Sequence, residues 1–270
     1  MTSIQKAIKY IAIAFAILLT VSIIGGILGA VGTVGFLFDI GETPIGEMKT
    51  YEISENITEL DIDIGAADFR VIEGESVSVK TNNKNITVKE NDGKLIISEK
   101  GRVLGYDYSS GELVVDLYFP KGIVFDKVDI TTGAGVVSIY TLTASDLSLE
   151  LGAGKAEIAT LVATKRADID GGAGQIIISG GELCNLDLDM GIGELSLTSV
   201  ITGKSEIDCG IGEVNITLLG GSDDYRIDVE KGLGDIRVDG KSFSGIYGDG
   251  NNKIDIDGGV GRINIKFEEK

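Results

Sequence analysis

The sequence predicts an all-β fold, a β-solenoid or β-helix of about 20-residue coils with Gly-x-Gly corners, preceded by one transmembrane helix. Three observations indicate this fold class: a Gly-x-Gly tripeptide that recurs along the chain, alternation of apolar and polar residues on both sides of it, and one long apolar stretch near the N-terminus. Successive corners lie 19, 20, 19 and 19 residues apart. The corners begin at Gly133, Gly152, Gly172, Gly191 and Gly210.

The residues around each corner alternate as they do in half-buried strands. Residues 186–190 are Leu-Asp-Leu-Asp-Met, and residues 194–197 are Glu-Leu-Ser-Leu. A period of two is typical of strands that bury one side. Glycine suits the corner because it adopts positive φ without a Cβ clash. A single coil buries too little apolar surface to fold alone, so we expect the coils to stack and share one core.

The composition excludes some classes of function. The chain has 24 basic and 42 acidic residues, a formal charge of −18, and no histidine. Because nucleic-acid phosphates attract basic surfaces, we expect no nucleic-acid partner. The absence of histidine removes the commonest general base and zinc ligand. Cys184 and Cys209 occupy different positions relative to their corners, so we expect small buried apolar residues rather than a disulfide.

The N-terminal region predicts a membrane anchor. We assign residues 1–9 to the cytoplasm and residues 10–38, which carry no charge, to a transmembrane helix that contacts the lipid bilayer. Such a helix would be about 43 Å long, against a hydrocarbon core of about 30 Å. Lys6 and Lys9 precede the span while Asp39 and Glu42 follow it, which predicts a single-pass protein of the cell membrane with its C-terminal domain outside. A signal peptide cleaved after the small residues around Val31 is the alternative.

Residues 39–50 are expected to form a linker, and residues 51–270 an extracytoplasmic β-solenoid domain. Its first corner is Gly65-Ala66-Ala67, and strands are expected at 76–80, 86–90 and 94–99, the last two joined by an Asn91-Asp92-Gly93 hairpin. A strand at 112–119 should end at Pro120. Later corners begin at Gly232 and Gly259, 22 and 27 residues on, so we expect residues 220–224 and 242–252 to protrude as loops.

Aligning the coils on their corners reveals rows of charge on one face. Positions two and four before the first corner glycine are mostly acidic, and the position six before it is mostly basic. We expect the basic row to screen the nearer acidic row, which leaves two interpretations of the outer acidic row. It is either a solvated face or a line of sites for a divalent cation such as calcium, with Asp170, Asp189 and Asp208 as the candidate metal ligands.

The residues Tyr118-Phe119-Pro120-Lys121-Gly122-Ile123, followed by residues 128–135 and serial Gly-x-Gly coils, resemble the bacterial putative-adhesin family of domains of unknown function. The resemblance covers roughly Tyr51 to Lys270. It implies a β-solenoid on the cell-envelope side of a bacterial membrane, often behind an N-terminal span. It also implies a role in adhesion or envelope-stress sensing, and it supplies no catalytic residues.

These observations predict a non-enzymatic cell-envelope module for adhesion, scaffolding or envelope-stress sensing. The alternatives are a divalent-cation-binding envelope protein and a carbohydrate-active β-helix enzyme, whose paired carboxylates would interrupt the repeat. No catalytic or cofactor-binding residue is predicted. An envelope protein or glycan is the expected partner, together with self-association through the membrane helix or the solenoid ends.

Overall fold

A computed structural model describes residues 44–54, 56–100, 112–230 and 232–269. The expected cytoplasmic segment 1–9, the expected membrane anchor 10–38 and the first part of the expected linker lie outside the described residues. Among the residues that the structure describes, no helix is long and apolar enough to cross a membrane.

Within these residues the chain is almost entirely β-strand, with a single 3₁₀ turn, η2, at Ser222–Asp224. The N-terminal strands are β1 (Ile45–Glu52), β2 (Glu59–Ala66), β3 (Asp68–Glu73), β4 (Ser78–Asn83), β5 (Ile86–Asn91), β6 (Lys94–Glu99) and β7 (Val114–Phe119). The central strands are β8 (Phe125–Ile178), β9 (Gly181–Cys184), β10 (Leu186–Thr202) and β11 (Lys204–Leu219). The last are β12 (Tyr225–Glu230), β13 (Leu233–Val238), β14 (Lys241–Ser242), β15 (Gly245–Tyr247) and β16 (Asn252–Glu268).

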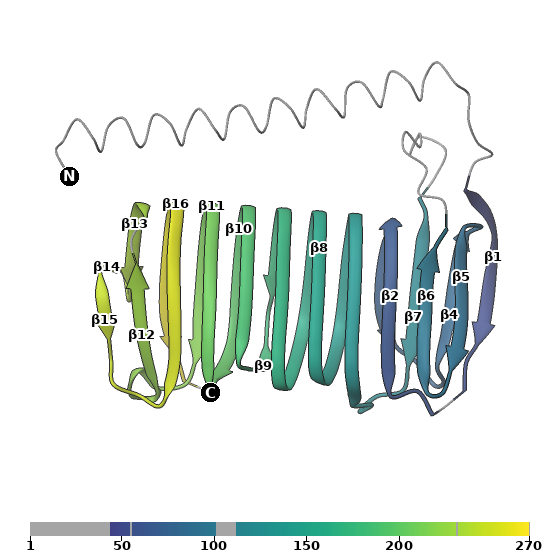
Figure 1. The fold of residues 1–270 in the computed structure, drawn as a ribbon, viewed down its shortest axis with the longest axis horizontal. Coiled ribbons are helices and arrows are strands. Elements are labelled where there is room, and N and C mark those ends of the chain that lie inside the picture. The colour runs from purple at the N-terminus through teal and green to yellow at the C-terminus, as the bar shows by residue number, and fades with distance from the viewer. Residues whose placement is uncertain (1–43, 55, 101–111, 231, 270) are drawn as a thin grey trace, which may run out of the picture. The chain divides into compact units, whose positions relative to one another are not determined.

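The central strands bend at each Gly-x-Gly corner and stack in parallel, as Figure 1 shows for β8, β10 and β11. Leu188 of β10 pairs with Ile169 and with Ile207, so equivalent residues of successive coils lie side by side. Its side chain is fully buried, as is that of Leu197 after the corner. The two strands of each coil therefore enclose a thin aliphatic core. The predicted all-β, solenoid-like architecture is confirmed for this part of the chain.

The second glycine of a corner is required by both backbone angle and space. Gly212 has a φ of 150°, a region that residues with a Cβ rarely adopt. A Cβ at Gly212 would lie 1.7 Å from the carbonyl oxygen of Gly193 in the neighbouring coil. The coils can approach to hydrogen-bonding distance at the corner only because no side chain stands between them.

At the N-terminal end, the coil formed by β2 and β3 lies between the β6–β7 coil and the first turn of β8. The expected hairpin between β5 and β6 is confirmed, with Asp92 and Gly93 at φ of 46° and 78°. The expected linker differs from the structure. Ile45–Glu52 forms β1, which pairs antiparallel with β4, so residues 45–50 belong to the sheet.

At the C-terminal end, the stacking order differs from the chain order. β16 inserts between β11 and the coil formed by β12 and β13, pairing in parallel with all three. Coils that follow one another in the chain are therefore not always neighbours in the stack. Ile256 separates Ile207 from Val229, and Ile265 separates Ile216 from Val238.

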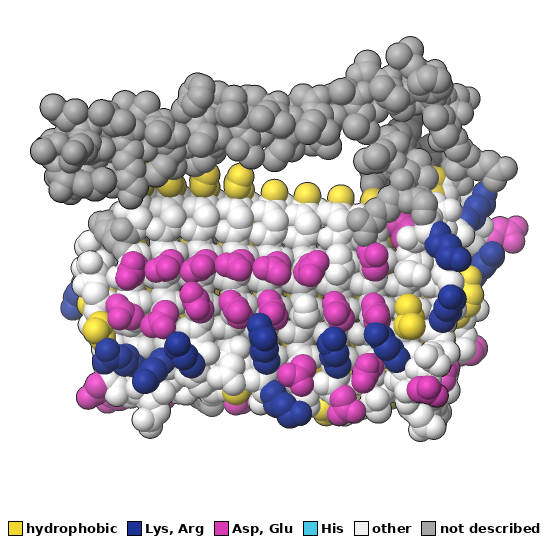
Figure 2. Space-filling view, in the orientation of Figure 1, with side chains coloured by type: hydrophobic (Ala, Val, Ile, Leu, Met, Phe, Trp, Pro, Cys, Tyr) yellow, Lys and Arg dark blue, Asp and Glu magenta, His cyan; other side chains and the backbone are white. Residues whose placement is uncertain are grey.

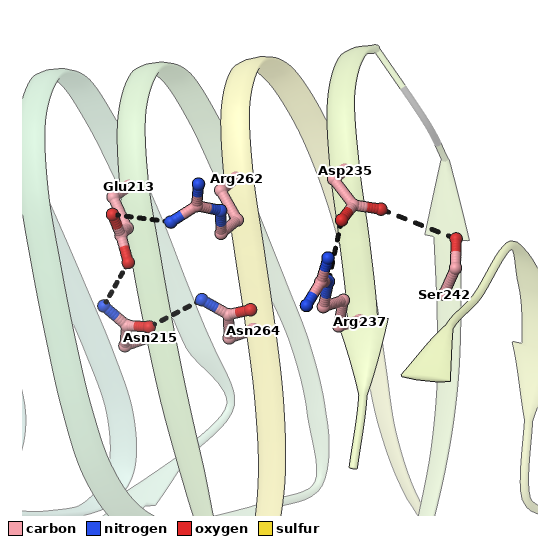
Figure 3. A network of polar contacts seen from close by, with 7 residues as sticks. All are labelled: Glu213, Asn215, Asp235, Arg237, Ser242, Arg262 and Asn264. Carbon is pink, nitrogen blue, oxygen red and sulfur yellow. Dashed lines mark hydrogen bonds and ion pairs between the residues drawn. The ribbon is translucent and has the colours of Figure 1, made fainter. Parts of the chain in front are cut away.

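Charge on the strands that follow the corners gives a physical reason for this insertion (Figure 3). Arg262 of β16 pairs in register with Glu213 on one side and with Asp235 on the other. Its Nη1 lies 3.4 Å from a carboxylate oxygen of Glu213. Stacking in chain order would instead place Glu213 beside Asp235, and like charges directly opposite one another are unfavourable.

The expected loop at 242–252 also differs from the structure. Much of it pairs with the coil formed by β12 and β13, which is the last coil of the stack. β15 pairs antiparallel with β12, and β14 pairs antiparallel with β13. The ring of Tyr247 stacks on Phe267 at 5.4 Å between centroids. The extra residues thus cover the end of the stack instead of protruding from it.

Candidate functional site

The strands that precede the corners form one face of the stack, which we call the acidic face (Figure 2). The strands that follow the corners form the rear face. Two rows of acidic side chains run across the acidic face, one residue per coil, because the coils are in register. The outer acidic row, two residues before each corner, consists in stacking order of Asp63, Thr131, Glu150, Asp170, Asp189, Asp208, Asp257 and Glu230.

The inner acidic row lies four residues before each corner, and part of it forms ion pairs with the row of basic residues beside it. Arg166 Nη2 lies 2.9 Å from a carboxylate oxygen of Asp168 and 3.6 Å from one of Asp187 in the next coil. At the N-terminal end, Lys94 lies 2.6 Å from Asp61. The prediction that the basic row screens the nearer acidic row is confirmed for Asp61, Asp129, Asp168 and Asp187, the members of that row that form ion pairs. These exposed pairs offset repulsion within the inner row but contribute little stability individually.

The outer acidic row holds the three residues predicted as metal ligands. Asp189 pairs in register with Asp170 on one side and with Asp208 on the other. Within the described part of the chain, no ion pair involves these three carboxylates. Partial burial, and then the charges of Asp168 and Asp189, raise the pKa of Asp170 above its usual value. Burial, followed by Asp189 and Asp257, does the same to the pKa of Asp208.

Asp208 differs from the other members of this row in the surroundings of one carboxylate oxygen. Its Oδ1 is buried and has no hydrogen-bond partner among the described residues. A buried carboxylate oxygen without a partner disfavours the charged form of the group. In both Asp170 and Asp208, burial therefore raises the pKa more than repulsion from neighbouring carboxylates does.

The row does not gather into a preformed metal site. Among the described residues, no three acidic, cysteine or histidine side chains converge closely enough to hold a metal ion. The reason is the geometry of the stack, which places one outer-row carboxylate on each coil, about 4.8 Å from the next. Calcium takes six to eight oxygen ligands at about 2.3–2.6 Å, so a line of single carboxylates leaves most of its coordination to water.

A second feature of this edge was not predicted from the sequence. The middle residues of the corners project outward and form what we call the corner ridge, seen as hydrophobic side chains along the edge in Figure 2. The ridge consists of Ala66, Ala134, Ala153, Ala173, Ile192, Ile211, Val260 and Leu233. Ile192, Leu233 and Val260 are 49%, 46% and 40% exposed. The change from alanine to larger aliphatic residues along the repeats was the signal that could have revealed it.

The cysteines add no reactive group to this edge. Both are free, as expected, but both are half-buried, whereas the sequence predicted buried side chains. Cys209 pairs in register with Met190 and Gly258 instead of with Cys184. Burial raises the pKa of the Cys209 thiol to about 12. The thiol therefore stays protonated at neutral pH, and a protonated thiol is a poor nucleophile. The edge as a whole offers a straight contact surface of apolar and acidic side chains.

Comparison with known proteins found similar solved structures and a matching family model. The chain is similar to a putative adhesin from Bacteroides fragilis NCTC 9343, with 16% identity, coverage of 83% of this chain and 100% of that one, and a TM-score of 0.45. It is also similar to a putative adhesin from Parabacteroides distasonis ATCC 8503, with 16% identity, coverage of 84% and 99%, and a TM-score of 0.43.

A third similar structure is named a putative lipid binding protein, also from Parabacteroides distasonis ATCC 8503, with 14% identity, coverage of 81% and 97%, and a TM-score of 0.39. No curated protein matches the sequence. The family model of Toastrack DUF4097 matches residues 57–266, most of the chain, which confirms the family expected from the serial corners. The chain therefore belongs to the Toastrack DUF4097 family, a domain of unknown function.

Proposed function

We propose that this protein is a non-enzymatic cell-envelope module for adhesion or scaffolding, which binds its partner along the corner ridge and the outer acidic row. The observation that carries the proposal is the in-register stacking of exposed aliphatic and acidic side chains along one straight edge. Equivalent groups repeated on a rigid support can engage a partner at several points at once, and such multivalent contacts add strength without any strong single site.

The chemistry of the edge defines the partner. Ile192, Val260 and Leu233 offer exposed apolar side chains along one edge, and the outer acidic row lies on the strands that lead into these corners. A complementary partner has an apolar stripe bordered by basic side chains. An envelope protein with a basic amphipathic segment has this character.

Display outside the membrane is part of the proposal. The apolar residues 10–38, with Lys6 and Lys9 before them, support an anchor whose N-terminus is cytoplasmic. In cells stripped of wall but with a sealed membrane, added protease should digest the C-terminal domain or cut residues 39–50. Protection of this whole region would contradict the topology.

The contact surface is tested in cells that express the full-length chain. We would measure the binding of these cells to immobilised envelope fragments of the same strain, with cells lacking the chain as the baseline. Replacing Ile192, Ile211, Val260 and Leu233 together by serine should reduce binding to that baseline. Three of these side chains are exposed, and Ile211 is half-buried and is not one of the buried core residues, so their loss leaves the core intact.

The matched control replaces exposed apolar residues away from the ridge. Met48, Val124 and Ile246 are 56%, 58% and 51% exposed, and their joint replacement by serine should leave binding unchanged. Equal binding by the ridge variant and the control variant would show that the ridge is not the contact surface. Binding no stronger than baseline by the unaltered chain would reject the adhesion function itself.

A further inference from the structure

The rear face carries a groove that the corner ridge and the acidic face do not involve. It has a volume of about 650 Å³ and crosses β3 and three successive coils of β8. Its lining includes Arg70, Ser138, Tyr140, Glu157, Ala159 and Ile177. This volume falls within the range of about 300–1,000 Å³ that is typical of sites for small ligands.

The groove arises because residues of different size occupy equivalent positions on neighbouring coils. The register that pairs Val71 with Ile139 places Ile72 beside Tyr140, and Ala159 holds the equivalent position in the next coil. The large ring of Tyr140 therefore lies beside the small side chain of Ala159. Ser138, one position along the same strand face, is also small, so the surface is hollow beside the ring.

Tyr140 is exposed to an unusual degree. Its side chain is 61% exposed, while every other aromatic residue in the described ranges is buried or half-buried. No ring contact of Tyr140 with another aromatic residue occurs within those ranges. The ring thus offers a free aromatic face, whose negative quadrupole attracts polarised C–H groups and cations.

The polar groups around the ring are held in place and their charges are largely compensated. Arg70 donates to both carboxylate oxygens of Asp116, at 2.6 and 3.0 Å, and Asp116 is buried. Glu157 lies 2.6 Å from Lys155 of its own strand. A planar bidentate pair fixes the orientation of the guanidinium group. The lining also includes Glu73, for which no ion pair occurs within the described residues. The groove therefore presents donors and acceptors with less net charge than the acidic face.

We propose that this groove binds a short, uncharged oligosaccharide, with one sugar ring stacked on Tyr140. The C–H groups of a sugar face match the negative face of the ring, and its hydroxyl groups match Ser138, Glu157 and Arg70, which together donate and accept hydrogen bonds. A cationic ligand would meet Arg70 as well as the acids of the lining, and an anionic polymer would be repelled by a chain of formal charge −18.

The test uses the full-length chain in detergent micelles and isothermal titration calorimetry. The probes are four uncharged tetrasaccharides, of β-linked glucose, β-linked N-acetylglucosamine, α-linked glucose and α-linked mannose. We expect at least one to bind with a dissociation constant below about 1 mM, and Tyr140→Ala to weaken that binding at least tenfold. Tyr140→Phe keeps the aromatic face and should retain binding within about threefold.

Two further variants separate the groove from the rest of the molecule. Ala159→Arg fills the hollow beside Tyr140 and should abolish binding, while Thr217→Arg changes an equivalent rear-face position three coils away and should not. The fourfold corner-ridge variant should bind the same probe unchanged, so failure of this inference and failure of the proposed function are distinguishable. Absence of binding to all four probes, or equal binding by Tyr140→Ala, would overturn the proposal. Stronger, Tyr140-dependent binding of an acidic oligosaccharide or a proline-rich peptide would also overturn it.

Discussion

Gly212 shows how a single hydrogen atom in place of a methyl group permits the stack. Alanine there would adopt an unfavourable φ, at about 1–3 kcal/mol. It would also force Cβ into the Gly193 carbonyl, 1.7 Å away, and overpacking of this kind adds about 1–3 kcal/mol. We therefore expect Gly212→Ala to lower the melting temperature clearly in thermal unfolding followed by circular dichroism.

Gly180→Ala is the matched control for that substitution. A Cβ at Gly180 would lie 3.4 Å from the Ala159 carbonyl oxygen, which is an ordinary contact, and its φ is not in the positive region. We expect its melting temperature to stay close to that of the unaltered chain. If both alanine variants unfold at the same temperature, close approach of the backbones is not what the corner glycine provides.

The raised pKa values of Asp170 and Asp208 predict how stability depends on pH. For an acid whose pKa is raised by folding, the associated stability is fully present below the unfolded-state pKa and is lost as pH rises through the folded-state pKa. At pH 7 both groups are charged and unfavourable. Asp170→Asn with Asp208→Asn should therefore raise the melting temperature at pH 7, and the difference should disappear below the ordinary value of 3.8.

The control for this pH effect is Asp223→Asn, which changes an exposed acid in η2 outside the row. It should leave the melting temperature nearly unchanged at both pH values. A stabilisation by the double variant that is equally large in acid would mean that it arises from packing and not from charge.

The insertion of β16 between β11 and the last coil makes Arg262 a determinant of strand order. Arg262→Asp would place three acids side by side, with Glu213 and Asp235 on its flanks. We expect a loss of about 1 kcal/mol, because exposed charge pairs contribute about that much. Hydrogen exchange should locate the loss in β12, β13 and β16, and adding Glu213→Arg should restore protection.

Lys266→Asp provides the comparison, since it changes charge on the same strand beside the uncharged Thr217. It should leave hydrogen exchange in the last coil unchanged. Equal loosening by Lys266→Asp and Arg262→Asp would show that general charge, and not the Glu213–Arg262–Asp235 row, holds β16 in place.

The sequence predicts register well but predicts strand order poorly. Constant spacing of the corners aligns Asp170, Asp189 and Asp208 without any structure, because a slip by one residue would turn buried Leu188 outward. Spacing alone does not say which coil lies beside which. The alternative orders differ in how they pair the charges of Glu213, Asp235 and Arg262. This difference is seen only when the orders are compared.

The candidate surfaces were predictable to different degrees. Acidic residues at fixed positions predicted the acidic face. The corner ridge was not predicted, because its residues are the variable middle residues of the Gly-x-Gly corners. The groove beside Tyr140 could not be predicted in the same way. It depends on the size difference between Tyr140 and Ala159 in adjacent coils, together with a buried Asp116 contributed by the distant strand β7.

At the scale of the whole domain, we predict how the melting temperature responds to cations. Calcium and sodium at equal ionic strength should change the melting temperature equally, because the outer acidic row provides single carboxylates and no convergent set in the described residues. An additional increase with millimolar calcium would instead favour the cation-binding interpretation. In that case, joint replacement of Asp170, Asp189 and Asp208 by asparagine should remove the increase.

The position of β16 also determines the order in which a growing chain can be completed. β12 and β13 leave the ribosome before β16, so the last coil has no parallel neighbour in its final place until residues 252–268 are made. Until then β11 and the last coil both expose unpaired backbone groups, which other chains could bind. A nascent chain that stops before residue 252 would thus lack a coil from within its stack. Such a chain would be a ready target for proteases that remove incomplete proteins.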